Sequence, residues 1–284
     1  MNAKDKLKKD FINIGLKEND IVMIRADISN ILKNIPDLKA KDILSILLEV
    51  VGENGTIVAP AYTSSSFIRR DKKIIFTKKS RTTSGLFSMV MLANTKSIRS
   101  EHPTNSHVAI GKYAEYILEN HNENAGAYEP TRRIMELGGK MLMLGCIKTS
   151  FGFNTTHLAE FDLGLPKRLI LPTLVTSYYE KNGEIKLFKR NDPGMCASNW
   201  YKLFGLYVRN EVLIQGYIGG SYSLICNAQD AYDIDYKVLS DNPKFNICKN
   251  KDCMQCRAQR WDNLIDLPFY IIRIIIRKLK NKKG

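Results

Sequence analysis

Three short apolar runs determine which folds are open to this chain. They are "DIVMIRADI" at residues 20–28, "GTIVAPAYT" at 55–63 and "KMLMLGC" at 140–146. Each run has the length and composition of a buried strand. Segments with helical character lie between them, such as "KAKDILSILLEVVG" at 39–52, which ends in a glycine. Strands that alternate with helices in this way predict an α/β fold, in which a mixed sheet is flanked by helices.

A hairpin pattern interrupts the alternation in the second half of the chain. Residues 170–190 alternate apolar and polar side chains around an Asn-Gly pair, which is typical of a tight β-turn. The polar and basic segment 64–84 has no clear periodicity and is predicted to be a long loop. We therefore expect one domain over residues 1–266 with a small β-hairpin excursion, followed by a basic amphipathic helix over residues 267–284.

The composition argues against several classes of protein. Hydrophobic residues make up 44% of the chain and charged residues 25%, which is typical of a globular protein. No stretch approaches the roughly 20 apolar residues that span a bilayer, and the first residues lack the apolar run of a secretory signal. Six cysteines without a signal indicate reduced thiols in the cytoplasm. The net charge of +14 is dispersed outside the C-terminal tail and no nucleic-acid motif is recognised, so we expect no nucleic-acid partner.

One of the four histidines has a carboxylate at helical spacing. His157 and Glu160, in "FNTTHLAEF", share a face of a helix that Asn154 or Thr155 would cap. A carboxylate beside an imidazole raises its basicity and fixes its tautomer, which suits a general base. Spacing alone also allows an incidental pair on an ordinary helix. A metal site with both residues is less favoured, because no third ligand stands at a diagnostic spacing.

Signatures of other chemistries are absent from the sequence. There is no G-x-S-x-G elbow and no recognisable catalytic cysteine signature, so nothing indicates a covalent nucleophile. The P-loop and G-x-G-x-x-G fingerprints are missing too, which leaves nucleotide hydrolysis and dinucleotide chemistry without support.

A series of motifs supplies the stronger signal. In chain order they are "VGENGTIVAPAYT", "TSGLFSMV", "RSEHPTNSHVAIG", "NTTHLAEF" and "NDPGMC". Their order over roughly residues 5–256 resembles that of the aminoglycoside 3-N-acetyltransferase family. The chain departs from the family where Arg25, Ala26 and Asp27 stand in place of a His-Ser-Ser sequence.

The resemblance implies an acyl-CoA-dependent N-acetyltransferase that moves the acetyl group of acetyl-CoA to the amine of an amino sugar and needs no metal. It implies that His157 is the general base and that Glu160 orients it or only braces the helix. Asp192 matches an aspartate of the family and is expected either to hold the histidine or the acceptor, or to form a tight turn before Pro193-Gly194.

The resemblance also suggests which residues bind the two substrates. Those expected to contact the cofactor are Arg25, Asp27, Thr83, Ser84, Gly85 and Ser106. Those expected to contact the acceptor are Tyr62, Thr63 and His102. For several of them a structural role is equally open: Ser84 as a helix cap, Tyr62 as a packed side chain and His102 as a loop-shaping residue.

The acceptor is predicted from charge. Aminoglycosides are polycations, whereas this chain is basic and segment 64–81 has seven basic residues against one acid. We therefore expect a nucleotide- or lipid-linked amino sugar of surface polysaccharide synthesis. The alternatives are an aminoglycoside-modifying resistance enzyme and a non-catalytic scaffold at a membrane.

Two features near the C-terminus leave further alternatives. The tail 267–284 is basic and rich in isoleucine, which favours contact with an anionic membrane surface on the inner face of the cell; packing against the domain or a homodimer partner stays open. Cys248, Cys253 and Cys256 could bind zinc with a fourth ligand such as Cys226, although free buried thiols are more common. No metal site is therefore expected.

Overall fold

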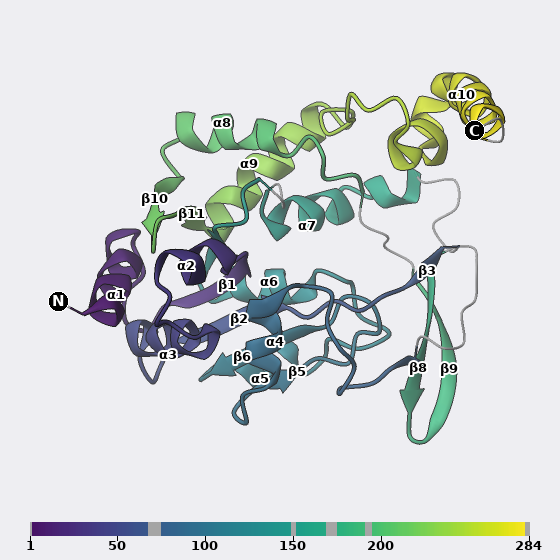
Figure 1. The fold of residues 1–284 in the computed structure, drawn as a ribbon. Helices are drawn as coiled ribbons and strands as arrows, with labels where there is room; N and C mark the ends of the chain where they lie inside the picture. Colours follow the sequence, from purple (N-terminus) through teal and green to yellow (C-terminus); the bar gives the residue numbers. More distant parts are fainter. Residues whose placement is uncertain (1, 68–74, 149–151, 169–174, 191–194, 282–284) are drawn as a thin grey trace.

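The computed structural model of this chain describes residues 2–67, 75–148, 152–168, 175–190 and 195–281. The helices and strands form one layered body around a central sheet, and the C-terminal helix projects at one corner (Figure 1). This arrangement confirms the predicted α/β fold with a mixed sheet and flanking helices.

Among the described residues, the main sheet has seven strands. They are β1 (Ile21–Ala26), β2 (Thr56–Pro60), β5 (Ile98–Arg99), β6 (His107–Gly111), β7 (Lys140–Leu144), β10 (Ile214–Ile218) and β11 (Ser221–Asn227). Their order is β10-β11-β7-β1-β2-β6-β5. β1 is parallel to both neighbours, β2 and β7, and the outer strands pair antiparallel. The three predicted apolar runs are therefore the central strands.

Helices cover both faces of this sheet, which explains why the central strands are apolar without interruption. Because side chains alternate along a strand, Val22 and Ile24 face one layer, whereas Ile21 and Met23 face the other. The first layer contains α1 (Ala3–Asn13), α3 (Ala40–Val51) and α4 (Leu86–Leu92). The second contains α5 (Ala114–Leu118), α6 (Glu129–Glu136), α8 (Tyr201–Arg209) and α9 (Ala228–Asp241). Gly52 ends α3 with a positive φ, as the sequence predicted.

A second, smaller sheet contains the hairpin. β8 (Val175–Lys181) and β9 (Glu184–Lys189) pair antiparallel, and both turn residues between them, Asn182 and Gly183, have positive φ. Positive φ at both positions is the geometry for which Asn-Gly is selected. The predicted loop 64–84 is not wholly irregular: it contributes β3 (Ser66–Phe67) and β4 (Ile75–Phe76), and both pair with β8.

The remaining elements follow the sheet. α7 (Asn154–Asp162) and a 3₁₀ turn (Leu165–Arg168) come after β7; a short helix that the sequence did not indicate, α2 (Ser29–Asn34), comes after β1. After α9 the chain forms a π-helical turn (Gln255–Gln259), a 3₁₀ turn (Trp261–Asp266) and α10 (Leu267–Lys280). No residue of α10 is buried. Among the described helices, none combines the length and apolarity needed to cross a bilayer.

Candidate functional site

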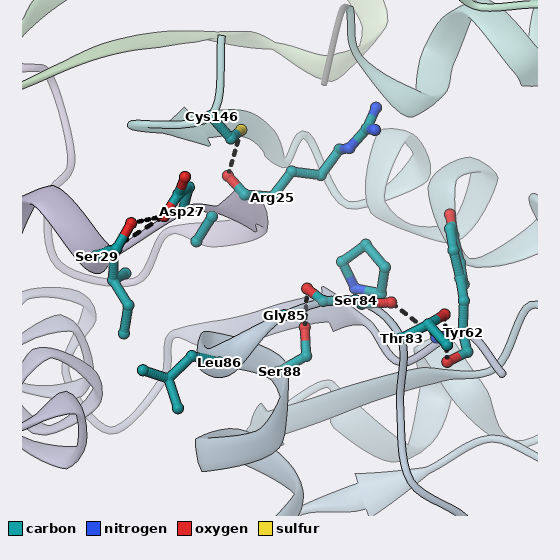
Figure 2. A pocket seen from close by; sticks show the side chains of 13 residues that line it. Arg25, Asp27, Ser29, Tyr62, Thr83, Ser84, Gly85, Leu86, Ser88 and Cys146 are labelled. Carbon is teal, nitrogen blue, oxygen red and sulfur yellow. Dashed lines mark hydrogen bonds between the residues drawn. The ribbon is translucent and has the colours of Figure 1, made fainter. Parts of the chain in front are cut away.

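A cavity of about 450 Å³ opens where β1 and β2 end, beside the start of α4. Because β1, β2 and β7 are parallel, their carboxyl ends lie at the same edge of the sheet, which is where ligands bind in many α/β proteins. Figure 2 shows residues from the end of β1 on one side and from the loop before α4 on the other. Five residues predicted to contact the cofactor line this cavity: Arg25, Asp27, Thr83, Ser84 and Gly85.

The β1 side of the cavity carries charges of both signs. The Arg25 guanidinium donates a hydrogen bond of 2.9 Å to the carbonyl of Gly152, just before α7. The Asp27 carboxylate accepts the N–H of Ser29 at 3.1 Å and also its hydroxyl. A bound phosphate would therefore be attracted by Arg25 and repelled by Asp27, so these two residues make opposing contributions to anion binding.

The opposite side is a hydrogen-bonded loop. The backbone N–H of Tyr62 donates to the Ser84 hydroxyl at 2.9 Å, and the backbone N–H of Thr83 donates to the Tyr62 carbonyl at 2.8 Å. Ser84 is thus not the cap of α4, which was the alternative considered for it. The residue at the cap position is Gly85, whose φ of 92° lies in the left-handed region.

His157 and Glu160 meet on α7. His157 Nδ1 and Glu160 Oε2 are 2.8 Å apart, and the other carboxylate oxygen, Oε1, accepts the amide N–H of Asn246 at 3.0 Å. Glu160 is almost fully buried, with 1% of its side chain exposed, whereas His157 keeps 16% exposed. Since a carboxylate only accepts, Nδ1 carries the hydrogen. The lone pair of the imidazole is then on Nε2, the nitrogen that a proton acceptor would use.

Two aromatic rings hold the imidazole. The Trp200 ring meets it edge-on with centroids 4.2 Å apart, and the Tyr128 ring stacks on it at 4.7 Å. Burial lowers the pKa of His157 below the ordinary value for histidine, and the hydrogen bond that His157 donates to Glu160 opposes part of this shift. The positive charges of Arg190 and Arg25 lower the pKa further. His157 is therefore neutral at pH 7 and able to accept a proton.

The start of α7 differs from the prediction. Phe153 is at the cap position and makes no side-chain cap, so neither Asn154 nor Thr155 caps this helix. The hydroxyls of Thr155 and Thr156 instead donate to the buried carboxylate of Asp235 on α9, at 2.8 and 3.1 Å. These two hydroxyls therefore donate to a carboxylate on another helix, and neither accepts a backbone N–H as a capping side chain would.

The histidine and the cavity are linked through shared contacts. The Asn154 amide donates to the Tyr62 hydroxyl at 3.3 Å, which joins the first residue of α7 to the cavity wall. Arg25 reaches from the cavity to the carbonyl of Gly152. The structure therefore brings together the predicted general base, its carboxylate and most of the predicted cofactor contacts.

The other predicted residues lie away from the lining of this cavity. Ser106 donates its hydroxyl to the carbonyl of Ala61 at 2.7 Å, and Thr63 donates to the carbonyl of Pro103 at 2.6 Å. His102 is buried, and its Nδ1 accepts the N–H of Asn105. These contacts shape the loop before β6. Asp192 lies outside the described residues.

Four residues around His157 were not indicated by the sequence: Tyr128, Trp200, Asp235 and Asn246. Each is distant from His157 in the chain, so no local spacing marks it. The one available signal was the "NTT" sequence, because two adjacent hydroxyls at a buried helix start need acceptors.

Comparison with known proteins supports the predicted family. The family model described as aminoglycoside 3-N-acetyltransferase matches residues 23–240. An aminoglycoside N(3)-acetyltransferase III from Salmonella is 25% identical over 265 residues, covering 81% of this chain and 88% of the relative. A protein of the same name from Serratia marcescens is 26% identical over 187 residues, covering 59% of this chain and 67% of the relative.

Solved structures share the fold. A mutant of the aminoglycoside acetyltransferase AAC(3)-IVa in complex with gentamicin superposes with a TM-score of 0.75 at 19% identity, covering 92% of this chain and 97% of that one. AAC-IIIb in a binary complex with CoASH has a TM-score of 0.69 at 21% identity, covering 84% and 97%. At these identities the likeness establishes the architecture.

The expected acceptor, a nucleotide- or lipid-linked amino sugar for polysaccharide synthesis, is wrong. The family model and the curated relatives are aminoglycoside acetyltransferases, which corresponds to the alternative. The prediction relied on charge counted along the sequence, and charge in the fold is distributed differently. Lys78, from the basic segment, pairs with Glu101 at 2.8 Å, and Lys181 pairs with Glu123. A basic sequence therefore does not imply a basic pocket.

Proposed function

The chain belongs to the aminoglycoside 3-N-acetyltransferase family, and we propose that it transfers the acetyl group of acetyl-CoA to the 3-amino group of an aminoglycoside. The predicted enzyme class, an acyl-CoA-dependent N-acetyltransferase, is confirmed by this membership. The observation that carries the proposal is the pairing of the partly exposed His157 with the buried Glu160, 2.8 Å apart, with Nε2 of His157 left to accept a proton.

The reaction needs a base because an ammonium group has no lone pair. In the proposed mechanism, His157 takes a proton from the acceptor amine while the nitrogen attacks the thioester carbon. The C–N bond forms, the C–S bond breaks, and the CoA sulfur leaves as a thiolate that takes up the proton held by His157, which returns the imidazole to its neutral form. Glu160 balances the positive charge that develops on the imidazole, and the Trp200 and Tyr128 rings keep its orientation.

We place acetyl-CoA in the cavity at the ends of β1 and β2. Support comes from the convergence of Arg25, Thr83, Ser84 and Gly85 on its walls and from their links to α7 through Tyr62 and Arg25. Roles for Ser106, Thr63 and His102 are proposed only as supports of the adjoining loop.

The decisive experiment follows release of the CoA thiol with purified protein. A panel of aminoglycosides is compared with the same compounds already acetylated on the 3-amino group. Turnover is expected with the free amines and none with the acetylated ones. Equal turnover on both sets would show that another position is modified. No turnover with any of these compounds would reject the proposed function.

Removing the base should abolish most of the activity. His157→Ala is expected to lower kcat by at least ~100-fold, which is typical for loss of a general base. CoA affinity, measured by calorimetry, should stay within about threefold, because the histidine acts on the acceptor. A variant that keeps near-full kcat would exclude His157 as the base.

We also propose that α10 contacts an anionic membrane surface, which would hold the protein at the inner face of the cell membrane. None of its residues is buried, and Ile271, Ile272, Ile275, Ile276 and Leu279 are all about half-exposed. Arg273 and Arg277 lie 3.7 and 3.6 Å from Asp252, whereas Lys278 and Lys280 extend the basic last turn. Exposed apolar side chains next to basic ones suit a helix in a membrane interface.

Vesicle flotation tests this second proposal. The full chain should float with vesicles containing anionic lipid, and a chain without residues 267–284 should not. Replacing Lys278 and Lys280 by glutamine should weaken binding by about fivefold per lysine. Absence of flotation, or a dimer that is lost on truncation, would contradict membrane contact and favour a role in self-association or packing.

A further inference from the structure

Four cysteines from two distant segments gather at one point of the fold. Cys196 comes just before α8, and Cys248, Cys253 and Cys256 come after α9. Their sulfur atoms all lie within 4.8 Å of one another. Cys226, the fourth ligand suggested by the sequence, is instead on β11, opposite Met141 in the sheet.

The spacing of these sulfur atoms fits a tetrahedral metal site. A zinc ion with Zn–S bonds of about 2.3 Å holds its four sulfurs about 3.8 Å apart. All four sulfurs of the group lie within 4.8 Å of one another, which accommodates this spacing. Three of the four cysteines are buried and the other, Cys253, is half-buried, so the site is closed to solvent on most sides. A set of thiolates alone favours zinc over magnesium or calcium, which prefer oxygen ligands.

The surrounding backbone supports this arrangement. Cys253 and Cys256 are separated by two residues: Cys253 lies two residues before the π-helical turn, and Cys256 is the second residue of that turn. The backbone N–H of Cys248 points to Cys256 Sγ at 3.5 Å. Amide N–H groups directed at sulfur stabilise the negative charge of metal-bound thiolates.

Ordinary packing of buried thiols explains the cluster less well. The chain contains two other buried cysteines, Cys146 and Cys226, and both lie outside the group. Free thiols gain little from meeting in fours, and the described cysteines are all unlinked. Four sulfurs converging from two segments is the arrangement that a structural metal requires.

We propose that Cys196, Cys248, Cys253 and Cys256 bind one structural zinc ion. The ion would tie the segment that leads into α8 to the segment that follows α9. These segments also support His157: Trp200 packs against its ring, and Asn246 donates to Glu160, the carboxylate paired with it. Asn199 on the first segment already donates to the carbonyl of Ile247 on the second, so the two are in contact beside the cluster. The zinc takes no part in acetyl transfer and stabilises the surroundings of His157.

Metal analysis of the full chain, purified without chelators, tests the proposal independently of activity. One zinc per chain is expected by plasma mass spectrometry. In the native protein, titration with a mercurial reagent should release that zinc as four thiols react. Cobalt substituted for zinc should give the visible absorption bands of a tetrahedral tetrathiolate site. Iron as the bound metal, or a disulfide within the group, would overturn the assignment.

Matched variants locate the site. Cys196→Ala should lower the zinc content by about tenfold or more, and Cys226→Ala, the same change at a buried cysteine outside the group, should leave it unchanged. If Cys196→Ala does not fold, the mercurial titration of the unmodified chain decides alone. Protein without zinc whose four thiols react freely in the native state would refute the proposal, whatever its acetyltransferase activity.

Discussion

Glu160 is held from both sides, by His157 at one oxygen and by Asn246 at the other. Glu160→Gln keeps the shape of the side chain and removes its charge. Because the carboxylate raises the pKa of His157 against the effect of burial, the variant should have a still lower pKa at His157 and a weaker base. We expect kcat to fall by about tenfold.

The pH profile distinguishes this effect from simple misfolding. The acid limb of kcat/KM reports the base in the free enzyme, and in Glu160→Gln it should move to lower pH. Asp162→Asn is the matched control, since Asp162 is on the same helix but pairs with Arg132 and Tyr232. An unchanged limb in Glu160→Gln would mean that Glu160 braces the helix without tuning the imidazole.

For single residues, the sequence identified the pairing of His157 with Glu160 because a helix brings positions i and i+3 together. It could not identify Asn246 or Trp200, since their contacts depend on how α8 and the segment after α9 pack on α7. The fourth cysteine escaped for the same reason. Cys196 and Cys226 both lie far from the other three in the sequence, and only the fold distinguishes them.

Among the elements, α7 depends on one buried carboxylate. Asp235 accepts the hydroxyls of Thr155, Thr156 and Tyr207. Asp235→Ala leaves three hydroxyls without this acceptor and should reduce the free energy of unfolding by about 3 kcal/mol. Activity should fall as well, because His157 follows these threonines on the same helix. Urea denaturation measures the first effect and CoA release the second.

The control for this prediction is a second aspartate on α9, the helix that carries Asp235. Asp233→Ala changes an exposed aspartate of α9 and should alter stability by less than about 0.5 kcal/mol. Equal losses in the two variants would show that the effect belongs to α9 in general and not to its contact with α7.

Elements whose own residues carry a clear pattern, such as an unbroken apolar run, were predictable, and elements made by tertiary contact were not. β1, β2 and β7 carry their own signal because both faces are buried. β3 and β4 have two residues each and exist through pairing with β8, so their sequence looked like a loop. The hairpin was predictable because its turn residues require positive φ.

For the whole molecule, the order of motifs along the chain was informative and the total charge was not. Motif order reflects the fold, which places Arg25 and Ser84 on one cavity and joins Arg25 to Gly152, just before the helix of His157, whatever the surface composition. Net charge sums over the entire surface and carries no information about where each charge lies. For this reason the enzyme class, an acyl-CoA-dependent N-acetyltransferase, was predicted correctly and the acceptor was not.

Stability of the whole molecule should depend on three buried histidines packed together. The His121 ring stacks on His102 with centroids 4.8 Å apart and lies 5.4 Å from His107. Burial lowers the pKa of His102 to about 3 and that of His107 to about 4, and it places the pKa of His121 well below 6.5. The folded chain thus keeps them neutral where the unfolded chain takes up protons.

The direction in which the free energy of unfolding changes with pH follows from which state takes up protons. Each histidine whose pKa is lowered in the folded chain contributes stability that is present above pH 6.5. This stability is lost as the pH falls toward the pKa of that histidine in the folded chain. Asp235 has the opposite effect: burial raises its pKa to about 7, so its contribution to stability increases as the pH falls. It is one group against three histidines. We therefore expect the free energy of unfolding to decrease from pH 8 to pH 5.

The contribution of one histidine can be isolated by comparing variants across pH. His107→Leu removes a ring that is fully buried and whose nitrogens have no hydrogen-bond partner among the described residues. Whatever its stability at pH 8, this variant should gain about 2 kcal/mol relative to the unmodified chain by pH 5, because it no longer has that proton to take up on unfolding. Urea denaturation at both pH values measures the difference. Parallel curves would mean that His107 titrates in the folded chain as it does in the unfolded one.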